Sequence, residues 1–161
     1  MNELMEPLTR YDWGGERASL YGIEIAIQDA RGDATRLAEI ELGLIGVLQS
    51  GAPLPAKEYA CRQFALIGTA QCVPALAAML SDADLLDRAL YALQAIPDAA
   101  ATTALREALN SAAGVARIGI VNALGERRDQ EAVPALEGLA SDPDTAMQGA
   151  VTSALRKIGT V

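Results

Sequence analysis

The sequence predicts an all-α fold built from stacked pairs of helices, and three observations support this prediction. Apolar residues make up 51% of the 161 residues but aromatic residues only 4%, so the core is built from Ala, Leu, Ile and Val. Small apolar side chains let helices approach closely, and alanine is the best helix former. A pattern also recurs at intervals of 29 and 31 residues, and Gly or Pro interrupts it at matching places.

The recurring pattern is anchored on one apolar position, which is occupied by Phe64, Leu93, Leu124 and Leu155. An apolar residue stands four positions earlier, one helical turn away on the same face. An isoleucine follows three positions later in every copy except one, in which Arg127 takes its place. We therefore expect these positions to form a continuous aliphatic core along the chain.

Each copy of the pattern predicts one helix, a short turn and a second helix, here called the A helix and the B helix. Gly68 and Gly159 suit left-handed caps at the ends of A helices, and Pro97 cannot continue a helix. Pro74 and Pro134 fall early in B helices, where a missing N–H is harmless. The predicted helices span about 56–66, 71–80, 84–95, 99–110, 115–125, 130–140 and 144–158.

Residues 1–50 differ from the repeats and predict a diverged helical cap of the same single domain, 1–161. Apolar residues at helical spacing predict helices over about 16–31 and 33–49, with a short helix near 2–10. Trp13 is expected to pack as a hydrophobic staple on Leu20 or its neighbours; the alternative is an exposed aromatic residue used in recognition. The repeats follow as the units 56–83, 84–114, 115–143 and a partial unit 144–161.

The stretches "ALQAIPDAAATTALREAL", "NALGERRDQEAVPALEGLASDPD" and "ALRKIGT" resemble HEAT-like repeats of the short bacterial type, also called phycobilisome-lyase-type HEAT-like repeats. This resemblance covers about residues 56–161. It implies a right-handed α-α superhelix, a HEAT/armadillo-like solenoid of about nine helices with three and a half repeats. "YDWGGERASLYGIEIAI" with "CRQFALIGTAQCVPALAAML" also resembles a HEAT module of larger bacterial proteins, many of them predicted to be exported.

Composition argues against several classes of function. The net charge of −8 disfavours a surface for nucleic acid or anionic membranes. The chain has no histidine, so histidine triads and histidine-ligated zinc are impossible within it. Cys61 and Cys72 lack metal-ligand spacing and are expected to be buried. Acidic pairs at 82/84 and 142/144 are interpreted as helix caps rather than as calcium ligands. We expect no metal, no cofactor and no catalytic residues.

The candidate binding surface is the outward stripe of the B helices, which line the concave side in the fold that the resemblance implies. This stripe is smooth and weakly charged, and it suits a helix or an extended segment of a protein partner. Acidic residues on it favour a basic segment. The predicted stripe consists of Ala75, Ala78, Ala104, Glu107, Ala135 and Gly138.

Arg127 and Arg128 stand where the other copies have isoleucine followed by glycine or proline. One interpretation is structural: the stem of Arg127 covers the core edge, and its guanidinium meets carbonyls at a helix C-terminus. The other interpretation is an anchor for an anion or a carboxylate. Both residues are therefore included among the candidate binding residues.

The sequence thus favours a non-enzymatic scaffold that binds a protein partner, as a monomer or a weak homodimer. One alternative, implied by the resemblance, is a subunit that attaches or isomerises bilin chromophores, with Cys61 or Tyr91 as the candidate reactive residue. A second is a HEAT-like protein that binds DNA or acts as a glycosylase. As given, the chain is expected in the cytoplasm; as a module of a longer protein, it is expected in the periplasm or outside the cell.

Overall fold

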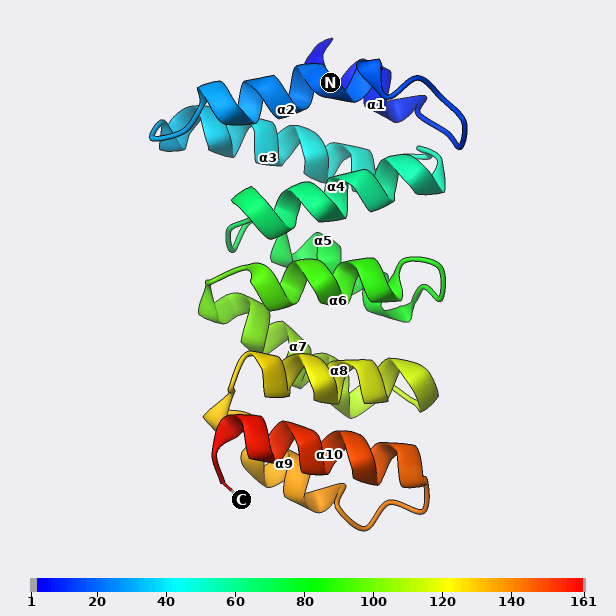
Figure 1. The fold of residues 1–161 in the computed structure, drawn as a ribbon, viewed down its shortest axis with the longest axis vertical. Coiled ribbons are helices and arrows are strands. Elements are labelled where there is room, and N and C mark those ends of the chain that lie inside the picture. The colour runs from blue at the N-terminus through cyan, green and yellow to red at the C-terminus, as the bar shows by residue number, and fades with distance from the viewer. Residues whose placement is uncertain (1–2, 161) are drawn as a thin grey trace.

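The computed structural model describes residues 3–160, apart from the side chain of Ser19, and this part of the chain is helical without a β-strand. Within these described residues, ten α-helices follow one another from the N-terminal to the C-terminal end of an elongated stack (Figure 1). Helices α4, α6, α8 and α10 lie one above another, and α5, α7 and α9 lie behind them. The predicted solenoid of stacked helix pairs is confirmed.

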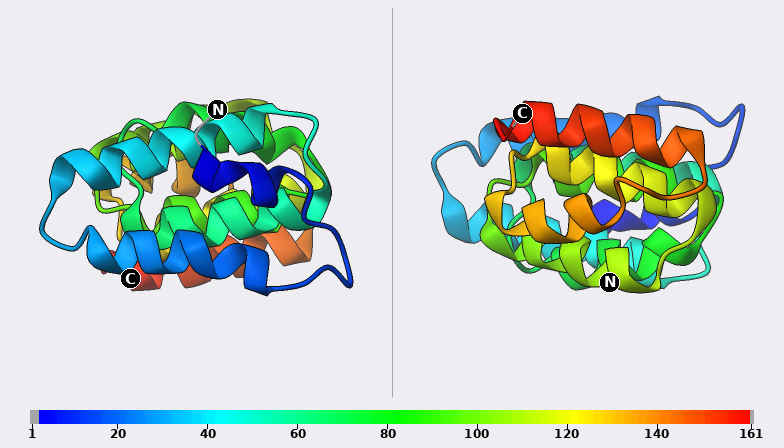
Figure 2. Two further views of the ribbon diagram at one scale, coloured as in Figure 1. Left: turned by 90° about the horizontal axis from the view of Figure 1, so that it is seen from above. Right: turned by 90° about the horizontal axis from the view of Figure 1, so that it is seen from below.

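The first helices form the N-terminal end of the stack. The turn η1 (Glu3–Met5) leads into the short helix α1 (Glu6–Thr9), and the pair α2 (Ala18–Asp29) and α3 (Ala34–Gln49) follows. Seen from above, α1 lies between α2 and α3 (Figure 2), and Met5 and Leu8 are fully buried there. The short helix predicted near 2–10 is present, although its expected start at residue 2 lies outside the described residues.

The next two pairs carry the first repeats. Helices α4 (Leu54–Ile67) and α5 (Val73–Ala78) form one pair, and α5 continues as the turn η2 (Met79–Ser81). Helices α6 (Leu86–Ala95) and α7 (Ala99–Ser111) form the other. As predicted, Pro74 stands in the first turn of α5, where its missing N–H breaks no hydrogen bond.

The remaining helices close the C-terminal end. They are α8 (Gly114–Glu126), the turn η3 (Gln130–Ala132), α9 (Val133–Gly138) and α10 (Thr145–Ile158). Asp144 caps α10, because its carboxylate accepts a hydrogen bond from the N–H of Ala146 at 2.9 Å. No side chain caps α6, although the acidic pair 82/84 before it was interpreted as a cap, and none caps α8.

The aliphatic core follows the predicted positions. Phe64, Leu93 and Leu124 have no exposed surface, and Leu155 is 8% exposed. The residues one turn earlier are buried as well, namely Ala60, Ala89, Ile120 and Val151. The repeating pattern is therefore the pattern of burial between successive A helices.

The two glycines predicted as left-handed caps behave differently. Gly159 has φ +95° and ends α10 as predicted. The prediction for Gly68 is wrong, because this residue is extended with φ −64° and ψ 141°. A Cβ there would lie 3.0 Å from Cys72 Sγ and would also collide with the carbonyl oxygen of Phe64. Glycine is therefore needed at position 68 because the turn between α4 and α5 leaves no room for a side chain, and not because the backbone is left-handed.

Candidate functional site

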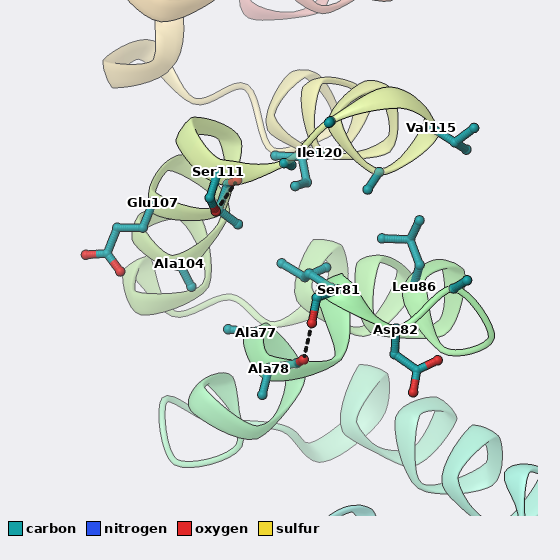
Figure 3. Close-up of a pocket in the computed structure, with 16 residues that line it drawn as sticks. Ala77, Ala78, Ser81, Asp82, Leu86, Ala104, Glu107, Ser111, Val115 and Ile120 are labelled. Carbon is teal, nitrogen blue, oxygen red and sulfur yellow. Dashed lines mark hydrogen bonds between the residues drawn. The ribbon is translucent and has the colours of Figure 1, made fainter.

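An apolar groove of about 790 Å³ opens between the first and second repeat pairs of the stack, α4–α5 and α6–α7. Its walls come from the C-terminal parts of two B helices, α5 with η2 and α7, and from the N-terminal parts of two A helices, α6 and α8 (Figure 3). Small side chains form the B-helix walls: Ala77, Ala78, Ala104 and Ala108. Larger apolar side chains form the A-helix walls: Leu86, Val115 and Ile120.

The groove arises where neighbouring B helices differ in length. Helix α5 has six residues and continues as the three-residue turn η2, whereas α7 has thirteen residues. The loop after η2 leads back to α6 while α7 still continues toward Ser111. Because the facing positions on α5 and α7 are alanines, no long side chain fills the space between them. Val115, at its edge, is 76% exposed.

The charge of the groove is acidic. Among the residues that line it, Asp82 and Glu107 are charged, and both are carboxylates. Asp82 accepts a hydrogen bond from the N–H of Asp84 at 2.9 Å through one oxygen. The two hydroxyls of the lining, those of Ser81 and Ser111, donate to carbonyl oxygens of their own helices at 3.3 Å. The groove therefore offers apolar surface and negative charge, but no activated nucleophile.

The structure brings together three of the predicted B-helix residues, because Ala78, Ala104 and Glu107 all line the groove. Ala135 and Gly138 are exposed on α9 but do not line it. The prediction for Ala75 is wrong: only 6% of this residue is exposed. Helix α5 contacts α3, α6 and α7, so the face that carries Ala75 belongs to the core.

Arg127 caps a neighbouring helix. Its guanidinium donates to four carbonyl oxygens and one hydroxyl around the C-terminus of α6, those of Leu93, Gln94, Ile96, Asp98 and Thr102. Carbonyls at a helix C-terminus lack intrahelical partners and carry the negative end of the dipole. Burial lowers the pKa of Arg127, and the carboxylates of Asp129 and Asp98 oppose this shift. Arg127 thus fits the structural interpretation, although it caps the preceding unit rather than its own helix.

Arg128 ends its own helix, α8, in a left-handed conformation with φ +53°. Its N–H donates to the Gly125 carbonyl at 3.0 Å, and the N–H of Asp129 donates to the Leu124 carbonyl at 3.1 Å. These two bonds form a Schellman motif, in which glycine is the usual left-handed residue. Arg128 therefore has the backbone role that Gly159 has at the end of α10, and its side chain is exposed.

Substituting Arg128→Gly is expected to stabilise the protein by about 0.5–1 kcal/mol. A non-glycine residue in the left-handed region costs about 1–2 kcal/mol, and the greater freedom of glycine in the unfolded chain offsets part of the gain. Urea denaturation measures the difference, with Arg128→Lys as the matched control that keeps both the strain and the charge. A lower stability for Arg128→Gly than for Arg128→Lys would contradict this account of the turn.

Two acidic residues that sequence analysis missed hold turns in place. Glu41 on α3 is fully buried, and its carboxylate accepts the N–H of Thr69 at 2.7 Å and the Thr69 hydroxyl at 2.9 Å. Asp129 is 9% exposed and binds Arg106 of α7 at 2.8 Å. A glutamate at a core-facing position of the apolar pattern was the available signal for Glu41, because a buried carboxylate needs a partner.

The two cysteines are buried and free, and burial raises the pKa of each thiol to about 12. This agrees with the prediction that they are small core residues. Because the thiolate is the nucleophile of cysteine chemistry, Cys61 is a poor reactive residue for the bilin alternative. Tyr91, the other candidate, is 55% exposed on α6 but does not line the groove.

Trp13 does not pack on Leu20 as the staple prediction required. Trp13 is 72% exposed, whereas Leu20 is buried with the rest of the core. Trp13 instead lines a small pocket of about 200 Å³, together with residues that include Arg17, Pro55 and Arg62. Gly14 adopts φ +79° directly after Trp13, so the chain turns before α2 begins.

Of the acidic pairs between units, 142/144 supplies a helix cap as predicted, through Asp144 on α10, whereas the prediction for 82/84 is wrong because no side chain caps α6. Asp82 and Asp142 each accept the N–H of the residue two positions later at 2.9 Å. Across residues 3–160, no three His, Cys, Asp or Glu side chains gather in a way that could hold a metal ion. No helix between residues 3 and 160 combines the length and the apolar character that a membrane span requires.

Comparison with known families gives two matches. A model described as HEAT repeats matches residues 105–161, and a model described as PBS lyase HEAT-like repeat matches residues 85–111. Together they span α6 to the C-terminus, which includes α7 and α8 of the groove. No curated protein matches the chain.

Proposed function

Because this chain is a HEAT-like repeat protein, we propose that it is a scaffold that holds a protein partner in the groove between α5–η2 and α7 and catalyses no reaction. The observation that carries this proposal is the groove itself, which is about 790 Å³ in volume and mainly apolar. Exposed apolar surface of this kind, rimmed by polar residues, is typical of interaction sites. The rims of such sites add specificity rather than most of the affinity.

The chemistry of the groove supports binding over catalysis. Its hydroxyls already donate to backbone carbonyls of their own helices, and among the described residues neither hydroxyl is hydrogen-bonded to Asp82 or Glu107, the carboxylates of the groove. The bilin alternative rests on the family match at 85–111, but neither Cys61 nor Tyr91 lines the groove. The nucleic-acid alternative conflicts with the net charge of −8 and with the acidic groove.

Photo-crosslinking in the host cells tests the scaffold function. A benzophenone amino acid at position 78 or 107 is expected to give a discrete adduct with a partner protein, because both positions line the groove. The matched control is position 152, which is exposed on α10 and does not line it. Absence of adducts at 78 and 107, or the same adducts at 152, would contradict binding in the groove.

A further inference from the structure

We propose that the segment held in this groove is an amphipathic α-helix that carries lysine or arginine on the two edges of its apolar face. This inference rests on the scaffold function proposed above, and it specifies the chemistry of the occupant. Three properties of the groove lead to it: the kind of backbone that forms the walls, the size of their side chains, and the placement of the two carboxylates.

The walls favour a helix over an extended segment. An extended segment gains affinity through main-chain hydrogen bonds to a free backbone edge. The walls here are helices, whose backbone groups are largely paired internally. Ser81 and Ser111 donate to carbonyls near the ends of α5 and α7. A helix needs no such partner, because it satisfies its own backbone.

The small side chains favour close approach of a helix. Ridges of one helix pack into grooves of another at axis separations of about 8–10 Å, and small side chains at the contact allow the shorter distances. Ala77 on one wall lies across from Ala104 on the other (Figure 3), and Ala78 and Ala108 line the same space. Leu86 and Val115 extend the apolar surface toward the A helices. The occupant therefore presents bulky aliphatic or aromatic side chains.

The two carboxylates define the charge of the occupant. Figure 3 shows Glu107 and Asp82 on opposite sides of the groove, on α7 and on the loop before α6. Within residues 3–160, neither carboxylate takes part in a salt bridge. Because no cationic side chain lines the groove, a helix with a cation on each edge gains two favourable pairs. An acidic helix would meet like charge on both sides.

Fluorescence anisotropy with model peptides on the full chain tests this inference. The probes are three labelled amphipathic helices of about 18 residues, or five turns, with a leucine stripe flanked by lysine, glutamine or glutamate. The lysine peptide is expected to bind most tightly and the glutamate peptide most weakly. The double variant Asp82→Asn/Glu107→Gln is expected to lower the affinity for the lysine peptide about three- to tenfold. Its affinity for the glutamine peptide is expected to change hardly at all.

Two controls separate this preference from general attraction to an acidic protein. The double variant Glu24→Gln/Glu39→Gln makes the same change in net charge at exposed positions outside the groove. The variant Ala78→Leu fills the groove at an exposed position and is expected to block every peptide that binds there. Asp82→Asn keeps the oxygen that accepts the Asp84 N–H, so the loop retains its turn.

Each outcome has a distinct meaning. If Asp82→Asn/Glu107→Gln weakens binding of the lysine peptide and Glu24→Gln/Glu39→Gln does not, the result supports a cationic helix in the groove. Equal binding of all three peptides, all blocked by Ala78→Leu, overturns the proposed charge of the occupant and leaves the scaffold function standing. If both double variants weaken binding of the lysine peptide equally, the proposed charge of the occupant is also overturned. If Ala78→Leu affects no peptide, helix binding in the groove is wrong, and the photo-crosslinks then decide on the scaffold function separately.

Discussion

Substituting Gly125→Ala is expected to destabilise the protein by about 1–3 kcal/mol, although alanine is the better helix former. Gly125 is buried on α8, where α10 packs against it. A Cβ at this position would lie 2.7 Å from the Cα of Ala154 and 2.8 Å from its Cβ. Since the obstructing atoms include backbone, α10 has to move as a whole, and the contact between the last two A helices loosens. Thermal and urea denaturation measure the loss.

The control for this prediction is Gly149→Ala. Gly149 lies on the exposed face of α10, and a Cβ there would meet nothing within 4 Å. Helix propensity alone then predicts a gain of up to about 1 kcal/mol. If the two alanine variants had the same stability, α8 and α10 would not be in the close contact that the structure describes.

Substituting Arg127→Met is expected to cost about 2–4 kcal/mol, because it removes several charge-assisted hydrogen bonds and leaves carbonyls at the end of α6 without a partner. Methionine keeps an apolar stem of similar reach, so the loss reports mainly on the guanidinium. We also expect hydrogen exchange to quicken at the C-terminal turn of α6, whose carbonyls Arg127 holds.

Two further variants make this result specific. Arg127→Lys keeps the positive charge but lacks the planar fork, so its stability is expected to fall between that of Arg127→Met and that of the unchanged protein. Arg128→Met removes the adjacent arginine, whose side chain is exposed, and is expected to have little effect. Equal losses for Arg127→Met and Arg128→Met would show that Arg127 does not act as a cap.

The sequence predicted the repeat units well because their determinants are local and periodic. Apolar spacing located the A helices, and Pro74 and Pro134 located the first turns of α5 and α9. The structural role of individual residues was harder to predict from the sequence. Gly68 was predicted as a left-handed cap, but it is needed for close packing against Phe64 and Cys72, which depends on how the turn folds back.

The candidate site was predicted in part for a similar reason. Helical spacing placed Ala78, Ala104 and Glu107 on one surface, where the groove lies. The same spacing misplaced Ala75, because burial on α5 depends on neighbours from three other helices. The exposure of Trp13 depends on the path of the loop before α2. No pattern within one repeat indicates a contact such as that of Arg127, which joins residues more than 30 positions apart.

Pulsed electron paramagnetic resonance can measure whether successive units stack in a line. Spin labels are attached at introduced cysteines in place of the exposed Arg62, Tyr91 and Thr152, on α4, α6 and α10; the native cysteines are buried. With about 8–10 Å between stacked helices, the 62–152 distance is expected to be roughly 25–30 Å, about three times the 62–91 separation. Comparable distances for the two pairs would indicate a closed bundle and would contradict the stacked arrangement.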